Sequence, residues 1–240
     1  MRVLSIGNSF SEDAQAYLHE AAALSGKNIT CFNMMIGGCS LARHYRNMLS
    51  GQKAYTLQIN GESSGIFINL EDVLQAGWSA ITFQQVSSSS MHYDTYQPYL
   101  NELVAYARKM APKVPIYLHE TWAYEQGTAR IASFGYEDQG EMYRDVHEAY
   151  AQAAKDIGAD GIIPSGTAFQ YLYQHGAPIH RDGAHAGLGV GRMTLAATWI
   201  QRLTGVDTRG MDWSSLHTAV PVTAEEIALA QEAANFACSQ

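Results

Sequence analysis

Three residues that together can perform acyl transfer stand at opposite ends of this 240-residue chain. Ser9 follows a short apolar run near the N-terminus, whereas Asp182 and His185 lie close together near the C-terminus. A serine hydroxyl is a weak nucleophile at neutral pH and needs an adjacent imidazole to accept its proton. A carboxylate beside the imidazole fixes its tautomer and stabilises the cation that forms. The sequence therefore predicts a nucleophilic hydroxyl served by a histidine–aspartate pair, provided that folding joins the two ends.

Acyl transfer also needs hydrogen-bond donors for the oxyanion of the tetrahedral intermediate. The backbone N–H groups of Ser9 and Gly38 are two candidates, and glycine at position 38 leaves the reacting centre uncrowded. A side-chain amide from Gln84, with Gln85 as the alternative, would supply a third donor.

Each of these residues also has a simpler explanation. Ser9 and Glu12 fit the S-x-x-E capping box of a helix N-terminus. The pair Asp182-Gly183 is typical of a turn. The order in which the residues occur along an alternating chain nevertheless favours a nucleophile, a base and an orienting group at one site.

Alternating strands and helices are expected to position these residues. Short apolar runs predict strands at 2–6, 29–34, 79–84, 115–119 and 160–163. Helical patterns follow at 11–25, 95–110, 137–157, 187–203 and 223–238. This alternation predicts a three-layer α/β/α fold with a flavodoxin-like, five-stranded parallel sheet of order 2-1-3-4-5. The site then lies at the carboxyl ends of the strands, where loops distant in sequence meet.

The arrangement of blocks along residues 2–204 resembles the SGNH, or GDSL-like, hydrolase superfamily. The chain is most similar to an uncharacterised bacterial branch at IGNSFS, IGGCSL, FQQVS, TWAY, IPSG and DGAH. The resemblance implies that Ser9 is the nucleophile, His185 the base, Asp182 its partner and Gly38 an oxyanion donor. The chain departs from the usual pattern of the superfamily at two places. Asn8 replaces an aspartate, and Gln84-Gln85-Val86-Ser87 replaces Gly-x-Asn-Asp.

Some carbohydrate acetylesterases of this superfamily carry glutamine at the third block. The resemblance therefore implies a serine esterase that acts on short acyl esters, with acetyl on a carbohydrate favoured. Asn8, Trp122 and His180 are the expected pocket residues, and the aromatic segment 122–141 is the expected lid or substrate wall. A non-catalytic carbohydrate- or ligand-binding protein on the same scaffold, a short-chain lipase and a thioesterase remain alternatives.

Composition limits the partners. Fifteen basic and 23 acidic residues give a net charge of −8, which argues against nucleic acid and anionic membranes as partners. The three cysteines are an odd number without metal-ligand spacing, so neither a disulfide framework nor a zinc site is expected. The esterase hypothesis implies no metal and no cofactor. The length favours a single domain over 1–240, in which 205–240 forms a C-terminal wrap and helix. The chain shows no signal peptide, which fits the cytoplasm, or the periplasm or secretion if an export signal has been removed.

Overall fold

The computed structural model describes all residues from 1 to 240 and is built on one central sheet. The sheet has seven strands in the order β4-β3-β2-β1-β5-β6-β7. Five strands pair in parallel: β1 (Arg2–Gly7), β2 (Thr30–Met35), β5 (Ala80–Phe83), β6 (Ile116–His119) and β7 (Gly161–Ile163). The other two form an antiparallel hairpin beside β2: β3 (Tyr55–Ile59) and β4 (Glu62–Ile68).

The prediction of a five-stranded, purely parallel sheet is therefore wrong, although its five strands are present in the expected relative order. The hairpin accounts for the difference. Its two-residue turn is Asn60-Gly61, and both residues have positive φ, at 51° and 83°. Asn-Gly favours this turn because both central residues must adopt the left-handed conformation, so the hairpin has a local sequence signal.

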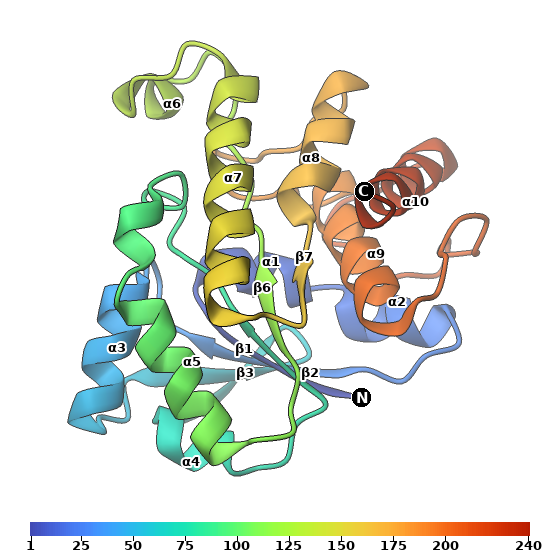
Figure 1. Cartoon of the computed structure of the whole chain (residues 1–240). Coiled ribbons are helices and arrows are strands. Elements are labelled where there is room, and N and C mark those ends of the chain that lie inside the picture. The colour runs from blue at the N-terminus through green and yellow to red at the C-terminus, as the bar shows by residue number, and fades with distance from the viewer.

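Helices cover both faces of the sheet, as Figure 1 shows. On one face lie α3 (Leu41–Ser50), α4 (Leu70–Leu74), α5 (Tyr99–Met110) and α7 (Gln139–Ile157). On the other lie α1 (Ser9–Gln15), α2 (Leu18–Leu24), α8 (Ser165–Gln174), α9 (Val190–Thr204) and α10 (Ala224–Cys238). A 3-10 turn (Tyr93–Tyr96) precedes α5, and the short α6 (Ala129–Ser133) stands apart within the segment 122–141. The molecule is thus a three-layer α/β/α structure, and the helix expected over 11–25 is divided into α1 and α2.

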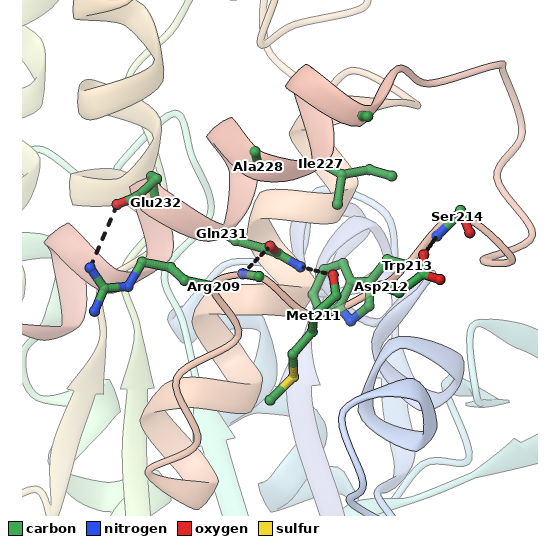
Figure 2. Close-up of a pocket in the computed structure, with 11 residues that line it drawn as sticks. Arg209, Met211, Asp212, Trp213, Ser214, Ile227, Ala228, Gln231 and Glu232 are labelled. Atoms are coloured by element: carbon green, nitrogen blue, oxygen red, sulfur yellow. Dashed lines mark hydrogen bonds and ion pairs between the residues drawn. The ribbon is translucent and has the colours of Figure 1, made fainter.

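One hydrophobic core joins these layers. A single cluster of 60 buried residues extends from Val3 in β1 to Ala237 in α10. The C-terminal segment is anchored to this core by Trp213, whose indole N–H donates to Ser25 Oγ at 3.1 Å. Gln231 of α10 bonds to the Gly210 N–H and the Met211 carbonyl, which holds the preceding loop on the helix (Figure 2). No helix is both long enough and apolar enough to cross a lipid bilayer.

Two histidines are fully buried in this framework. His44 Nδ1 pairs with the Tyr55 hydroxyl at 3.0 Å and so ties α3 to β3. His119, the last residue of β6, lies between Gln84 Oε1 and Ser165 Oγ, at 2.8 and 3.1 Å. Burial lowers the pKa of each histidine to about 3, with a further contribution from nearby Arg43 in the case of His44. Both imidazoles are therefore neutral in the folded protein at neutral pH.

Acid should destabilise the fold through these two groups. In the unfolded chain, His44 and His119 become protonated below pH 6.5, the ordinary pKa of histidine. In the folded state, both imidazoles stay neutral down to about pH 3. The contribution of these two histidines to the free energy of unfolding is therefore fully present above pH 6.5. It falls as the pH is lowered, by up to about 1.4 kcal/mol per pH unit for each histidine. Urea unfolding between pH 7 and 4 measures this slope. A His44→Gln variant keeps a partner for Tyr55 and should show a shallower slope; an unchanged slope would contradict the assignment.

Candidate active site

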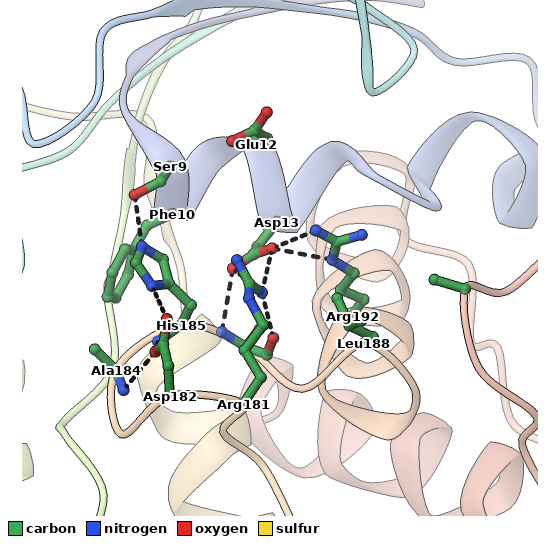
Figure 3. Close-up of polar contacts among 12 residues, drawn as sticks. Ser9, Phe10, Glu12, Asp13, Arg181, Asp182, Ala184, His185, Leu188 and Arg192 are labelled. Atoms are coloured by element: carbon green, nitrogen blue, oxygen red, sulfur yellow. Dashed lines mark hydrogen bonds and ion pairs between the residues drawn. The ribbon is translucent and has the colours of Figure 1, made fainter.

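Ser9, His185 and Asp182 form one chain of hydrogen bonds, although Ser9 and His185 are 176 positions apart in the sequence (Figure 3). Ser9 Oγ lies 2.9 Å from His185 Nε2, and His185 Nδ1 lies 2.7 Å from Asp182 Oδ2. The carboxylate favours a proton on Nδ1, which leaves Nε2 free to accept the serine proton. The fold thus places a hydroxyl, an imidazole and a carboxylate in the relative positions that nucleophilic catalysis requires.

The start of α1 leaves the Ser9 hydroxyl free for this contact. Asn8, not Ser9, is the N-cap: its Oδ1 accepts the Phe10 N–H at 3.0 Å. Ser11, not Glu12, completes the capping box, because its hydroxyl accepts the Asn8 N–H at 3.0 Å. The expected Ser9–Glu12 capping box is therefore wrong. Asn8 takes the cap because its side chain is buried at the end of β1, whereas Ser9 begins the helix and faces His185.

The Asp182 carboxyl group remains ionised over the whole pH range in which proteins normally fold. Its partial burial raises the pKa, but three hydrogen bonds outweigh that effect and lower the pKa to about 2. They come from the His185 N–H, the His185 ring and the Ala184 N–H. The turn that carries Asp182 and His185 therefore also supplies the donors that keep the carboxylate charged.

An open cleft of about 430 Å³ lies in front of Ser9. It is lined by Asn8, Ser9, Phe10, Gly37, Gly38, Val86, Ser87, Ser88, Tyr124, Arg130 and His185. Gly38 has φ of +59°, a conformation that glycine adopts without strain, and its backbone N–H has no partner within the protein. The N–H of a first helical residue such as Ser9 also lacks an acceptor within its own helix. Two residues that line the cleft, Ser9 and Gly38, therefore have backbone N–H groups without a partner inside the protein.

The side-chain amides expected as a third donor are buried and do not line the cleft. Gln84 Nε2 donates to Asn8 Oδ1 at 2.8 Å, while its Oε1 pairs with His119 Nδ1. Gln85 Nε2 donates to the Thr95 carbonyl and hydroxyl, and its Oε1 accepts the N–H groups of Leu41 and Val86. Both glutamines hold loops together, since a buried amide must satisfy its donors and acceptors locally.

Of the three expected pocket residues, Asn8 lines the cleft, whereas Trp122 and His180 do not. Asn8 borders the cleft, but its side chain is buried and donates to the Cys39 carbonyl at 3.1 Å. Trp122 is fully buried, stacks on Phe10 at 4.2 Å and donates its indole N–H to the Ala184 carbonyl. His180 contacts the Ala123 carbonyl and lines a separate hollow. Trp122 and His180 are thus supports behind the site, because the aromatic segment folds beneath the turn that carries His185.

Asp13 is a residue of the site that sequence reasoning missed. Its carboxylate is fully buried and accepts hydrogen bonds from Arg181 and Arg192 at 2.8–3.0 Å, and from the Ala186 N–H at 3.1 Å (Figure 3). Asp13 stands one helical turn after Ser9, and its partners flank the turn that carries His185. Arg181 is therefore an ion-pair partner of Asp13. The only sequence signal was an acid on the same helical face as Ser9.

Comparison with known proteins places the chain in a family. The family model DUF4886, a domain of unknown function, matches residues 2–237, and the chain belongs to this family. A DUF4886 family protein from Bacteroides uniformis ATCC 8492 is 35% identical; the match covers 99% of this chain and 94% of that one, with a TM-score of 0.89. No curated protein matches the chain in sequence.

More distant solved structures share the fold. A proposed SGNH hydrolase from Slackia heliotrinireducens is 23% identical, with 84% of this chain and 97% of that one covered and a TM-score of 0.61. An acetylxylan esterase from Geobacillus stearothermophilus is 15% identical, with 85% and 94% covered and a TM-score of 0.55. The resemblance to the SGNH superfamily is thus supported at the level of the fold. The family whose model matches the chain is DUF4886.

Substitutions at Ser9 and Asn8 should separate capping from chemistry. Ser9→Ala removes no cap and should change the free energy of unfolding by less than about 0.5 kcal/mol. Asn8→Ala removes the cap and the partners of Gln84 and Cys39, and should cost about 2 kcal/mol or more. Urea denaturation of both variants measures the difference. A larger loss of unfolding free energy for Ser9→Ala than for Asn8→Ala would show that Ser9, not Asn8, is the N-cap.

Removing the charge of Asp13 should destabilise the protein strongly. Asp13→Asn leaves Arg181 and Arg192 facing a neutral group, and breaking a buried ion pair in this way costs about 3 kcal/mol. The matched control is Glu141→Gln, which removes an exposed pair with Arg144 at 3.9 Å and should cost less than about 0.5 kcal/mol. Equal losses in thermal or urea unfolding would show that the Asp13 ion pairs contribute little.

Proposed function

We propose that this protein is a serine esterase that hydrolyses short acyl esters, with an acetyl group on a carbohydrate as the favoured substrate. The observation that carries the proposal is the hydrogen-bonded chain Ser9–His185–Asp182, of which Ser9 and His185 line an open cleft. The family model leaves the activity open, whereas the shared fold of SGNH-type hydrolases agrees with a hydrolase.

The proposed reaction is a double displacement. Ser9 Oγ attacks the ester carbonyl while its proton passes to His185 Nε2, and Asp182 stabilises the imidazolium. The backbone N–H groups of Ser9 and Gly38 donate to the oxyanion. The intermediate collapses to an acyl-serine, and His185 gives its proton to the departing alcohol. Water, deprotonated by His185, then attacks the acyl-serine and releases the carboxylic acid and the Ser9 hydroxyl.

The favoured substrate rests on two further observations. An acetylxylan esterase is among the proteins that share the fold. The cleft is open, and Ser87 and Ser88 are among the residues that line it, which suits a hydroxylated alcohol part better than a long acyl chain. A short-chain lipase or a thioesterase would differ in its preference for acyl length and leaving group.

Covalent labelling and hydrolysis assays test the proposal. The wild type should react with a fluorophosphonate and hydrolyse acetylated sugars, and Ser9→Ala should abolish both activities. His185→Ala should lower kcat about 10⁴-fold or more, because residues of such a unit act together. Nitrophenyl esters of increasing length and an acyl thioester separate the alternatives. A folded wild type that neither reacts nor hydrolyses any ester, yet binds sugars, would identify a non-catalytic binding protein.

A further inference from the structure

One wall of the cleft carries a positive charge that the proposed reaction does not use. Of the residues that line the cleft, Arg130 alone bears a permanent charge, and no aspartate or glutamate is among them. Asp182 lies behind His185 and does not line the cleft. A ligand in front of Ser9 therefore meets a guanidinium that no carboxylate of the cleft neutralises.

Arg130 is also without an acidic partner elsewhere. The arginines that form ion pairs are Arg144, Arg181, Arg192 and Arg209. The Arg130 guanidinium instead lies over the ring of Tyr124, 5.4 Å from its centroid. A cation–π contact orients a guanidinium without neutralising it. Arg130 therefore brings a positive charge without a carboxylate partner to the cleft that Ser9 also lines.

Arg130 belongs to a capped helix and contacts a buried tyrosine ring. Arg130 is carried by α6, whose first turn is capped by Thr128 and whose Ile131 is buried. Tyr124 is buried and donates its hydroxyl to Ser87 Oγ at 3.0 Å. One wall of the cleft is therefore formed by Arg130, Tyr124, Ser87 and Ser88. These side chains are polar or charged.

We propose that this wall, Arg130 with Ser87 and Ser88, binds a carboxylate of the substrate, so that the substrate is an acyl ester that carries a negative charge. Guanidinium pairs with carboxylate through two parallel hydrogen bonds, and serine hydroxyls can donate to the remaining lone pairs. This inference rests on the proposed function for the position of the ester, but the binding site itself does not require catalysis. The carboxylate can belong to the alcohol part, as in an acetylated uronic acid, or to the acyl part, as in a hemisuccinate.

Two matched pairs of esters test the proposal and distinguish these sources. The first pair is an acetylated methyl glucuronoside and the corresponding acetylated methyl glucoside. The second is 4-nitrophenyl hemisuccinate and 4-nitrophenyl butyrate. Binding of each ester is measured by calorimetry with the Ser9→Ala protein, and the measurement is repeated with Arg130→Met added. Arg144→Met is the control, because it removes another exposed positive charge, from α7 and outside the cleft.

The charged member of at least one pair should bind more tightly than its neutral partner. Arg130→Met should reduce this preference roughly two- to fivefold, as expected for an exposed ion pair, and added salt should weaken it. The Arg144→Met control should leave the preference unchanged. Equal binding of charged and neutral esters in both pairs, or a preference that survives Arg130→Met, would overturn the proposal. Selective binding without any hydrolysis by the wild type would instead overturn only the proposed esterase function.

Discussion

The buried carboxylate of Asp13 is the constraint on which the candidate site depends. It joins α1, which begins with Ser9, to the turn and helix that follow residue 180, through Arg181, Arg192 and the Ala186 N–H. A buried charge is costly unless it is fully paired, so the two segments are held in one relative position. The Ser9–His185 distance of 2.9 Å is a consequence of that position.

A second polar network fixes the ends of the neighbouring strands. Asn8 after β1, Gln84 after β5, His119 of β6 and Ser165 after β7 form one line of buried hydrogen bonds. The pKa of His119, lowered to about 3 by burial, keeps the ring neutral, so that one nitrogen donates to Gln84 and the other accepts from Ser165. Gln84 is thereby committed to the framework. This network explains why the Gln84 amide does not line the cleft.

The segment 122–141 serves the site in two ways. Its first part lies beneath the turn of His185: the Trp122 indole donates to the Ala184 carbonyl, and the Glu125 N–H donates to the Gly183 carbonyl at 2.9 Å. Its second part, with α6, stands away from the body of the molecule and brings Arg130 to the cleft (Figure 1). One stretch of chain therefore supports the candidate catalytic turn and shapes the surface that a substrate meets.

The sequence alone determined the five parallel strands, because apolar runs and helical periodicity are local signals, and it singled out Ser9, Asp182 and His185. Ser9 follows β1, whereas Asp182 and His185 lie in the turn between α8 and α9, and only folding brings that turn to Ser9. The polar, glycine-bearing stretch 42–70 also indicated a short hairpin or excursion, and Asn60-Gly61 is the turn of the hairpin found there. Only the tertiary structure decided which polar side chains face the cleft. Asn8 and Ser9 are adjacent, as are Gln84 and Gln85, and their types cannot tell which is buried; the partners that satisfy them come from distant segments. The pairing of Asp13 with two distant arginines was hidden for the same reason.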